Sequence, residues 1–244
     1  SGAWNNPDVW TSDPGGTTFV NPGNSIPGNG DVVVILPSRT VTLRNGNVSS
    51  TELDITIQAS GTLDDSLFTF TSPLSALRGK GTLKLKTNSF PEATVNTFVN
   101  SGGGTVEFYN TTNFLLPVTQ TIYNNLVINC TGAIATQAGN LTINGNLKVQ
   151  TGTYQINDES SNRRSLIISG DVTVNSGAFL TVGTGRTNST TDPTSVGTGG
   201  TAPFLDYYVS QSHRVEVYGN FINSGTVRFT NQPYPDFNNF PDNG

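Results

Sequence analysis

The chain has 244 residues, of which 12% are charged, and its formal net charge is −5. Because the balance is acidic and the lysines are scattered, the sequence provides no basic surface for nucleic acid or for an anionic membrane. No apolar run is long enough to cross a bilayer, so nucleic-acid binding and direct membrane insertion are both excluded from the expected functions.

Residues 1–45 predict an N-terminal cap and the first strands of the fold. They contain both tryptophans of the chain, Trp4 and Trp10, and an aliphatic run at residues 32–36. Five consecutive aliphatic residues predict a strand that is buried on both faces, as in a first strand covered on its outer side. We expect Trp4, Trp10 and Asp31 to form this cap by packing. Carbohydrate stacking on the tryptophans is the alternative.

The rest of the chain reads as strand, turn and strand. Segments such as "RTVTLRNG", "TELDITIQASGTL", "GTLKLKTN" and "GTVEFYN" alternate Val, Leu or Ile with Thr, Asn or Lys. This period of two places one face of each strand in a core and the other in water. Helical periodicity is almost absent, so the sequence predicts an all-β protein.

Internal repetition is clearest in three segments, at residues 141–157, 166–183 and 215–231. Each has an apolar-x-apolar-x-Gly-(Asn/Asp)-apolar pattern, followed a few residues later by Gly-(Thr/Ala)-apolar. The positions that align are Gly145, Gly170 and Gly219, then Leu147, Val172 and Phe221, then Gly152, Gly177 and Gly225. The first two copies are 25 residues apart, which is a typical repeat length for a solenoid.

A repeat of this length is too short for a four-stranded propeller blade, but it can form one coil of a parallel β-helix. We expect a right-handed parallel β-helix over residues 46–244, because parallel crossovers are almost always right-handed. The glycines are predicted to mark corners with positive φ, and the Asn that follows them to hydrogen-bond the next coil. The polar tract at residues 183–203 is predicted to be an inserted loop. A β-sandwich is the alternative, because the spacing is irregular.

The opening of the chain also resembles a known family. The pattern of two tryptophans, a turn, and then Pro-x-x-Gly-Asp-x-Val-x-Ile is filled by Trp4, Pro7, Trp10, Pro27, Gly30, Asp31, Val32, Val34 and Ile35. It resembles the amino-terminal segment of the domain family named for its eight glycines. The later sequence "YNNLVIN…LTINGNLKVQTGTY" is similar to repeats of large surface proteins exported by the type nine secretion system. The resemblance implies an extracellular or bacterial cell-surface location, with secretion or outer-membrane anchoring proteins as partners.

Candidate catalytic groups are few, and no catalytic residue is predicted. His213 is the one histidine, which disfavours a Ser-His-Asp triad or a histidine metal site, and Cys130 is expected to be a small apolar residue of a strand. The carboxylates that remain are Asp64 and Asp65, and Asp158 and Glu159 near Arg163 and Arg164. Neighbouring residues of a strand point to opposite faces, so each pair could act together only in a turn.

Two sets of residues are candidates for weaker ligand contacts. Exposed aromatics that could line a glycan groove are Tyr207, Tyr208, Tyr234 and Phe237. The C-terminal stretch at residues 233–244 offers calcium the oxygen ligands of Asp236, Asn238 and Asp242, although such clusters usually form turns. No other cofactor is expected.

The function predicted from these patterns is that of a non-enzymatic stalk or adhesin segment of a large secreted cell-surface protein. It would mediate display or attachment to glycans or other surface polymers, and further coils or domains are expected to follow. The alternative is a polysaccharide-binding or polysaccharide-degrading β-helix protein.

Overall fold

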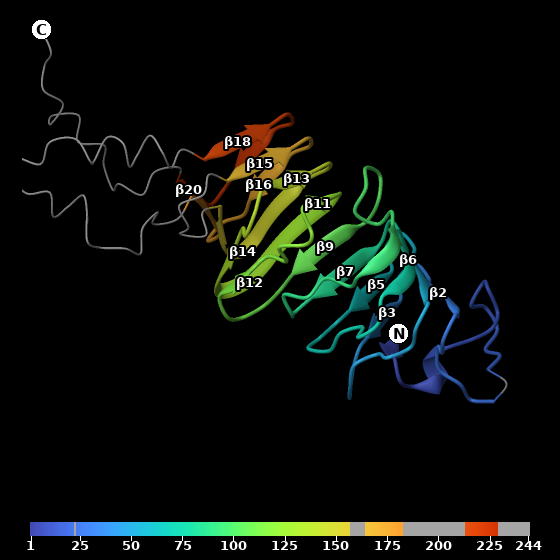
Figure 1. Ribbon diagram of the computed structural model, residues 1–244. Helices are drawn as coiled ribbons and strands as arrows, with labels where there is room; N and C mark the ends of the chain where they lie inside the picture. Colours follow the sequence, from blue (N-terminus) through green and yellow to red (C-terminus); the bar gives the residue numbers. More distant parts are fainter. Residues whose placement is uncertain (22, 157–163, 183–212, 229–244) are drawn as a thin grey trace, which may run out of the picture.

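The computed structural model describes residues 1–21, 23–156, 164–182 and 213–228, and in these ranges the chain is almost entirely β-strand. The helical element of this part is one turn of 3₁₀ helix, Pro7–Val9. All paired strands that are described run parallel and stack along one axis as a β-solenoid (Figure 1). The predicted parallel β-helix is therefore confirmed, and the β-sandwich is wrong because its sheets would be antiparallel.

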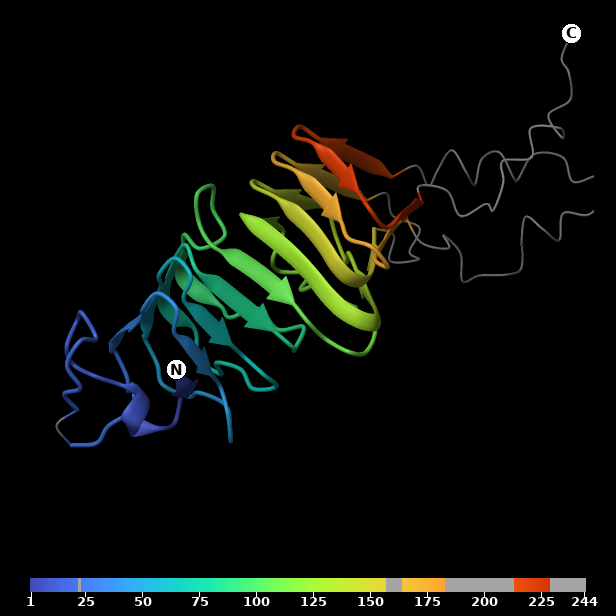
Figure 2. The same ribbon diagram turned by 180° about the vertical axis from the view of Figure 1, so that it is seen from behind.

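The longest sheet runs along the whole described solenoid, and Figure 2 shows its strands as successive rungs. In spatial order its main path consists of β1 (Gly2–Ala3), β3 (Thr40–Thr42), β5 (Thr62–Asp64), β7 (Thr82–Leu85), β9 (Thr105–Phe108), β12 (Asn125–Thr136), β14 (Leu147–Gln155), β16 (Val172–Val174) and β19 (Phe221–Asn223). Strands that follow one another in this order are separated in the chain by a strand of another face, which is the topology of a solenoid.

The second face consists of two sheets of four strands. The N-terminal one contains β2 (Val32–Ile35), β4 (Asp54–Ile57), β6 (Leu74–Gly79) and β8 (Ala93–Asn96). The C-terminal one contains β11 (Ile122–Tyr123), β13 (Leu141–Ile143), β15 (Ser165–Ile168) and β18 (Arg214–Val217). The two sheets are not joined by strand pairing, so this face is interrupted between β8 and β11.

A third side appears where the strands of the longest sheet continue around a corner. β12 turns at Gly132, whose φ is +76°, and its second half pairs with β10 (Phe114–Leu115) and with the second half of β14. The side continues through β17 (Phe179–Thr181) and β20 (Thr226–Arg228). In the N-terminal half, the corresponding place in chain order holds an isolated parallel bridge between Val48 and Phe70.

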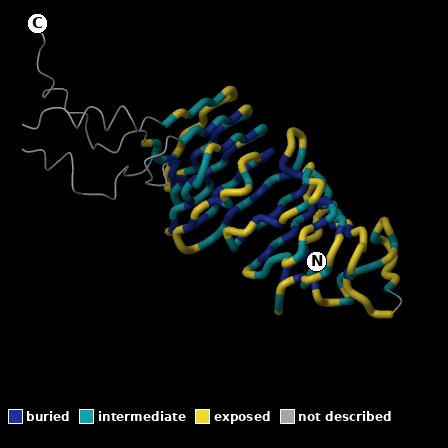
Figure 3. The backbone as a smooth tube through the Cα atoms, in the orientation of Figure 1, coloured by how far each residue is buried: buried dark blue, intermediate teal, exposed yellow. Residues whose placement is uncertain are grey.

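The core is a thin interior column of stacked side chains, and Figure 3 colours the backbone of buried residues dark blue along the solenoid. One aliphatic row passes through seven successive coils in exact register: Val41, Leu63, Leu83, Val106, Leu126, Leu147 and Val172. All seven are buried, and burying a side chain of this size is worth about 1.5–3 kcal/mol. A second buried row on the same sheet runs from Leu85 through Phe108, Ile128 and Val149 to Val174. Because a few such rows fill the narrow interior, a low hydrophobic content is sufficient for the fold.

The predicted repeat alignment holds for its first half. Leu147 pairs with Val172, and Val172 pairs with Phe221. The glycines before them are also joined, because Gly170 N donates to Gly145 O at 2.9 Å and Gly219 N donates to Gly170 O at 3.2 Å. The third copy therefore stacks directly on the second, since β15, β16 and β17 pair with β18, β19 and β20. The predicted loop at residues 183–203 lies outside the described residues.

The second half of the alignment is wrong by one residue. Tyr154 pairs with Leu180, and Leu180 with Val227, so Ala178 rather than Gly177 is in register with Gly152. The cause is one extra residue between Val172 and Leu180 compared with the same stretch of the preceding coil. A turn at the corner absorbs this residue without disturbing the strands that follow.

The first set of corner glycines also has a different role from the one predicted. Gly170 does not have the positive φ that was expected, although Gly177 does, at +77°. Instead, a Cβ on Gly170 would lie 2.3 Å from Asn146 Oδ1 and 2.6 Å from Gly145 O. Glycine is required there because the coil below leaves no space for a side chain.

The N-terminal strands differ from the prediction in burial. Val33 and Ile35 of β2 are buried, but Val32 is 73% exposed and Val34 is also exposed, so the run at 32–36 is not covered on both faces. Burial therefore alternates along β2, because no described segment covers its outer face. Trp4 is 2% exposed, and its ring packs edge-on against Trp10 at 5.0 Å and against Phe70 at 5.4 Å between centroids.

Candidate functional site

The best-organised polar cluster in the described structure lies on the outer face of the longest sheet. Asp64, Lys84 and Glu107 are neighbours in register on β5, β7 and β9. Each follows a Gly-Thr-apolar sequence, so the alternation that buries the apolar residue places the charged residue outside. Polar residues directly after β7 and β9, and others on the neighbouring strands β12 and β14, extend this row into a cluster that we call the polar ladder: Asp64, Lys84, Lys86, Glu107, Tyr109, Asn129 and Thr151.

A chain of contacts crosses four strands of the polar ladder. Lys84 Nζ lies 3.3 Å from Glu107 Oε1, and the same oxygen accepts a hydrogen bond from Asn129 Nδ2 at 2.8 Å. Asn129 Oδ1 in turn accepts from the hydroxyl of Thr151 at 2.9 Å, and Thr131 and Thr151 are joined at 3.1 Å. The ladder therefore presents carboxylate, amide, ammonium and hydroxyl groups in fixed positions on a rigid sheet.

Tyr109 adds an aromatic ring to the polar ladder. Its hydroxyl donates a hydrogen bond to Asp64 Oδ1, and the Nζ atoms of Lys84 and Lys86 lie 4.8 Å and 6.0 Å from the ring centroid. Burial, together with the hydrogen bond to Asp64, raises the pKa of Tyr109 well above its ordinary value, so the hydroxyl remains a donor at neutral pH. The two lysines make favourable cation–π contacts with the ring.

The two neighbouring carboxylates of the sequence analysis point in opposite directions. Asp64 belongs to the outer polar ladder, whereas Asp65 is 5% exposed and points inward. Asp65 accepts hydrogen bonds from the backbone N–H groups of Lys86 and Thr87, at 2.6 Å and 3.2 Å, and from the Thr87 hydroxyl at 2.5 Å. Burial raises the pKa of Asp65, and these hydrogen bonds oppose the rise. The two aspartates are therefore not arranged as a catalytic pair, as alternation predicted.

His213 and Cys130 both contact the backbone: His213 contacts the neighbouring coil, and Cys130 contacts its own strand. His213 lies directly before β18, and its Nδ1 accepts the backbone N–H of Arg164 at 3.0 Å across neighbouring coils. Cys130 is fully buried in β12, and its Sγ lies 3.5 Å from Ala133 O. Burial raises the pKa of the Cys130 thiol, which keeps it in the weakly nucleophilic protonated form.

The other predicted ligand residues lie outside the described residues. These are the aromatic candidates Tyr207, Tyr208, Tyr234 and Phe237, the calcium candidates Asp236, Asn238 and Asp242, and the charged residues Asp158, Glu159 and Arg163. In the ranges that the structure does describe, no three His, Cys, Asp or Glu side chains come together as a metal site. No helix in those ranges is long and apolar enough to span a membrane.

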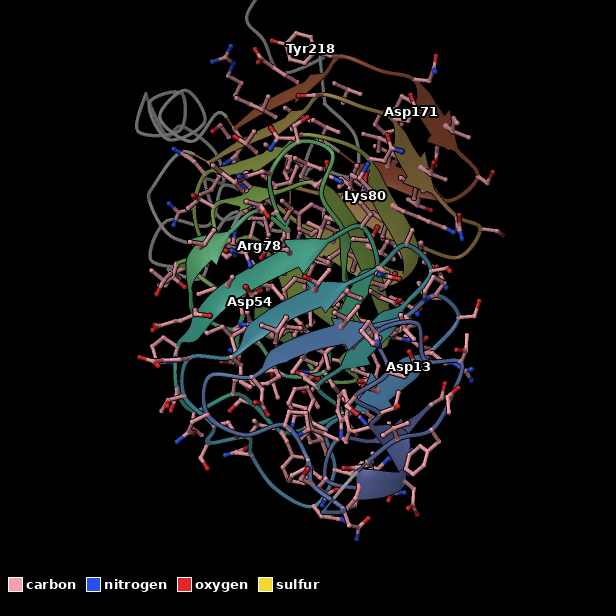
Figure 4. The ribbon with its side chains drawn as sticks, turned by 90° about the vertical axis from the view of Figure 1, so that its right-hand side faces the viewer. Asp13, Asp54, Arg78, Lys80, Asp171 and Tyr218 are labelled. Carbon is pink, nitrogen blue, oxygen red and sulfur yellow. The ribbon has the colours of Figure 1, made fainter. Side chains whose placement is uncertain are left out.

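A groove of about 690 Å³ lies at the N-terminal end of the solenoid, between residues 8–31 and β2. Trp10 and Asp31, two of the predicted cap residues, line it. The indole of Trp10 donates to Trp4 O at 2.7 Å, and Asp31 Oδ2 accepts from Gly28 N at 2.7 Å, which closes the turn before β2. Figure 4 places Asp13, another lining residue, at this end and Asp171 at the other. The sequence pattern contained no signal for this groove, because loop packing forms it.

The sequence did contain a signal for the polar ladder. The three motifs Gly-Thr-Leu-Asp, Gly-Thr-Leu-Lys and Gly-Thr-Val-Glu at residues 61–64, 81–84 and 104–107 end in charges of alternating sign. Whether these three charged residues become neighbours depends on the register between the strands, which the spacing in the sequence alone does not determine.

Comparison with protein-family models, with curated proteins and with solved structures found no match to this chain. The resemblance to the eight-glycine family and to type nine secretion cargo stays a prediction. The class that the fold defines is that of a parallel β-solenoid with a polar outer face.

Proposed function

We propose that the chain is a non-catalytic adhesin or stalk segment of a secreted cell-surface protein, and that the polar ladder binds a glycan. The observation that carries the proposal is the chain of hydrogen bonds that fixes Lys84, Glu107, Asn129 and Thr151 on four neighbouring strands. Carboxylate, amide and hydroxyl groups are the partners that sugar hydroxyls require, and here they are held in place before any ligand arrives.

The repeat of the solenoid supports a polymeric ligand rather than a single sugar. Strands of one sheet lie roughly 4.8 Å apart, so groups on successive coils recur at that interval along the axis. A glycan chain that lies along the axis meets Asp64, Lys84 and Glu107 in turn, and then the amide of Asn129, which is hydrogen-bonded to Glu107. Lys86, whose Nζ lies 6.0 Å from the ring centroid of Tyr109, offers a cationic group at the side of this track.

The fold supports the display part of the proposal. Parallel coils that each contact only their neighbours form an elongated body, which keeps a binding face at a distance from its attachment. The aliphatic row through seven coils makes this body continuous from β3 to β16.

The test is a glycan array on the purified chain, followed by titration of the best glycan. We expect Asn129→Ala and Lys86→Ala to weaken binding by about tenfold, which corresponds to about 1.4 kcal/mol. Lys80→Ala is the matched control for Lys86, because exposed Lys80 carries the same charge at a corner away from the ladder.

Two outcomes would contradict the proposal. Equal loss of binding in the Lys86 and Lys80 variants would show general charge attraction rather than recognition by the ladder. Release of shorter oligosaccharides from a bound polysaccharide would show that the protein is a catalyst.

A further inference from the structure

Strand β2 has a free edge at the N-terminal end of the solenoid. Asp31 O accepts from Asp54 N and Ile35 O accepts from Gln58 N, both at 3.0 Å, so the odd-numbered residues face β4. Because backbone groups alternate in direction along a strand, the N–H and C=O groups of Val32 and Val34 point away from β4. In the part of the chain that the structure describes, no strand pairs with this side of β2.

The groove of about 690 Å³ lies beside this edge. Its other side is the segment at residues 11–20, which is folded back on itself by hydrogen bonds from Ser12 N to Val20 O and from the Thr11 hydroxyl to Thr18 O. Asp13 fixes the turn of this segment by accepting the N–H groups of Gly15, Thr17 and Thr18. The open edge is therefore bordered by a structured loop and not by an extended tail.

The chemistry of the groove favours a particular kind of occupant. Its exposed apolar side chains include Val32 (73% exposed), Phe19 (60%) and Ile26 (41%). The carboxylate side chains that line it are Asp8, Asp13 and Asp31, against one basic side chain, Arg39. Asp13 and Asp31 each accept backbone N–H groups within their own turns, and these hydrogen bonds leave their negative charges in place. An unpaired strand edge is a template for a further strand, and here the charge beside it is mainly negative.

We propose that the groove binds an extended peptide of a partner protein, with alternating apolar and basic residues, which adds a strand to the free edge of β2. The backbone of the peptide would pair with Val32 and Val34, its apolar side chains would pack on the exposed valines, and its basic side chains would face Asp8 and Asp31. Addition of a strand obtains affinity from main-chain hydrogen bonds and specificity from alternate side chains. This site is separate from the polar ladder and does not depend on glycan binding.

The sharpest variant is Val34→Pro. The N–H that it removes points into the groove and not toward β4, and proline is tolerated in an edge strand when its N–H side faces solvent. Val34→Thr is the matched control, because it keeps both the N–H group and a β-branched side chain. The probe is a short synthetic peptide of alternating valine and lysine, titrated into the full chain and followed by fluorescence anisotropy.

We expect the valine–lysine peptide to bind the wild type and Val34→Thr equally, and Val34→Pro at least about tenfold more weakly. A valine–glutamate peptide should bind much more weakly than the lysine peptide. If Val34→Pro fails to fold, as judged by circular dichroism, the same question is answered with a peptide N-methylated on alternate amides, which should lose binding to the wild type.

Three results would overturn the proposal. The first is undiminished binding of the lysine peptide to folded Val34→Pro, or of the N-methylated peptide to the wild type. The second is the absence of any binding by the lysine peptide. The third is concentration-dependent dimerisation of the wild type in sedimentation experiments that Val34→Pro abolishes, which would assign the edge to a second copy of this chain.

Discussion

Asn146 Oδ1 accepts the backbone N–H of Asp171, which lies in the next coil, at 2.8 Å. The same bond joins Asn125 to Asn146 at 2.9 Å and Asp171 to Asn220 at 2.7 Å. Three of these residues directly follow a corner glycine, as the repeat pattern predicted for Asn at this position. Four coils are thus joined at one corner by a column of side-chain to backbone hydrogen bonds, in addition to the strand pairing.

Asp171 provides the cleanest test of this column. Asp171→Ala removes the oxygen that accepts from Asn220 N, whereas Asp171→Asn keeps an oxygen and reproduces the residue of the neighbouring coils. Both variants remove the same charge. We expect the alanine variant to lose about 0.5–1.5 kcal/mol of unfolding free energy, measured by urea denaturation, and the asparagine variant to stay near the wild type. Equal destabilisation of the two would assign the effect to the charge and not to the hydrogen bond.

Gly170 should tolerate no side chain. In Gly170→Ala the new Cβ meets Asn146 Oδ1 at 2.3 Å and the backbone of Gly145 at 2.6 Å, so neighbouring coils must separate. We expect a loss of about 1–3 kcal/mol in thermal or urea unfolding, which is the range for overpacked sites. Gly139→Ala is the control, because a Cβ there meets nothing within 4 Å. A Gly170 variant as stable as the Gly139 variant would contradict the spatial argument.

The sequence was sufficient for the fold where each coil repeats the same local pattern. Leu147, Val172 and Phe221 could be placed in one row because each stands two residues after a corner glycine. The predicted pairing of Gly152 with Gly177 is wrong because one inserted residue lengthens a turn. The alignment on glycine selected Gly177, whereas Ala178 is the residue in register with Gly152.

The candidate site was less accessible to sequence reasoning. Asp64 was identified beside Asp65, yet its partners Lys84 and Tyr109 come from other coils, 20 and 45 residues away in the chain. Such neighbours are defined only by register, and register between coils depends on the length of every turn between them. The exposure of Val32 was missed for a related reason, because a hydrophobic run does not tell which of its faces another segment will cover.

Asp65 should make stability fall as the pH rises. Burial raises the pKa of Asp65 in the folded protein above the ordinary value of 3.8. At a pH between the unfolded and the folded pKa, the carboxyl group is therefore ionised in the unfolded chain but still protonated in the folded one, and this difference favours unfolding. The contribution of Asp65 is therefore complete below pH 3.8 and is lost as the pH rises through the folded pKa. The measurement is the difference in urea midpoint between the wild type and Asp65→Asn from pH 3.5 upward. We expect the wild type to lose stability relative to the variant across this window, and a relative gain would contradict the prediction.

Tyr123 and Tyr154 are both fully buried, but only one of the two hydroxyls is satisfied. Tyr154 donates to Gln137 Oε1 at 3.0 Å, and the Nε2 of Gln137 donates in turn to the backbone oxygens of Gly139 and Ser165. The hydroxyl of Tyr123 has no hydrogen-bond partner among the residues that the structure describes. Desolvation raises the pKa of both tyrosines, so each hydroxyl stays protonated at any ordinary pH.

The same substitution should therefore have different effects at the two positions. Tyr154→Phe leaves the buried oxygen of Gln137 without its donor, and we expect it to cost about 1–3 kcal/mol in urea unfolding. Tyr123→Phe removes a buried hydroxyl that makes no hydrogen bond. We expect this variant to be as stable as the wild type or more stable, because water hydrogen-bonds that hydroxyl only in the unfolded chain. The two variants remove the same atom from the same interior and serve as controls for each other. Destabilisation of the Tyr123 variant as large as that of the Tyr154 variant would show that the Tyr123 hydroxyl has a partner, such as a buried water molecule.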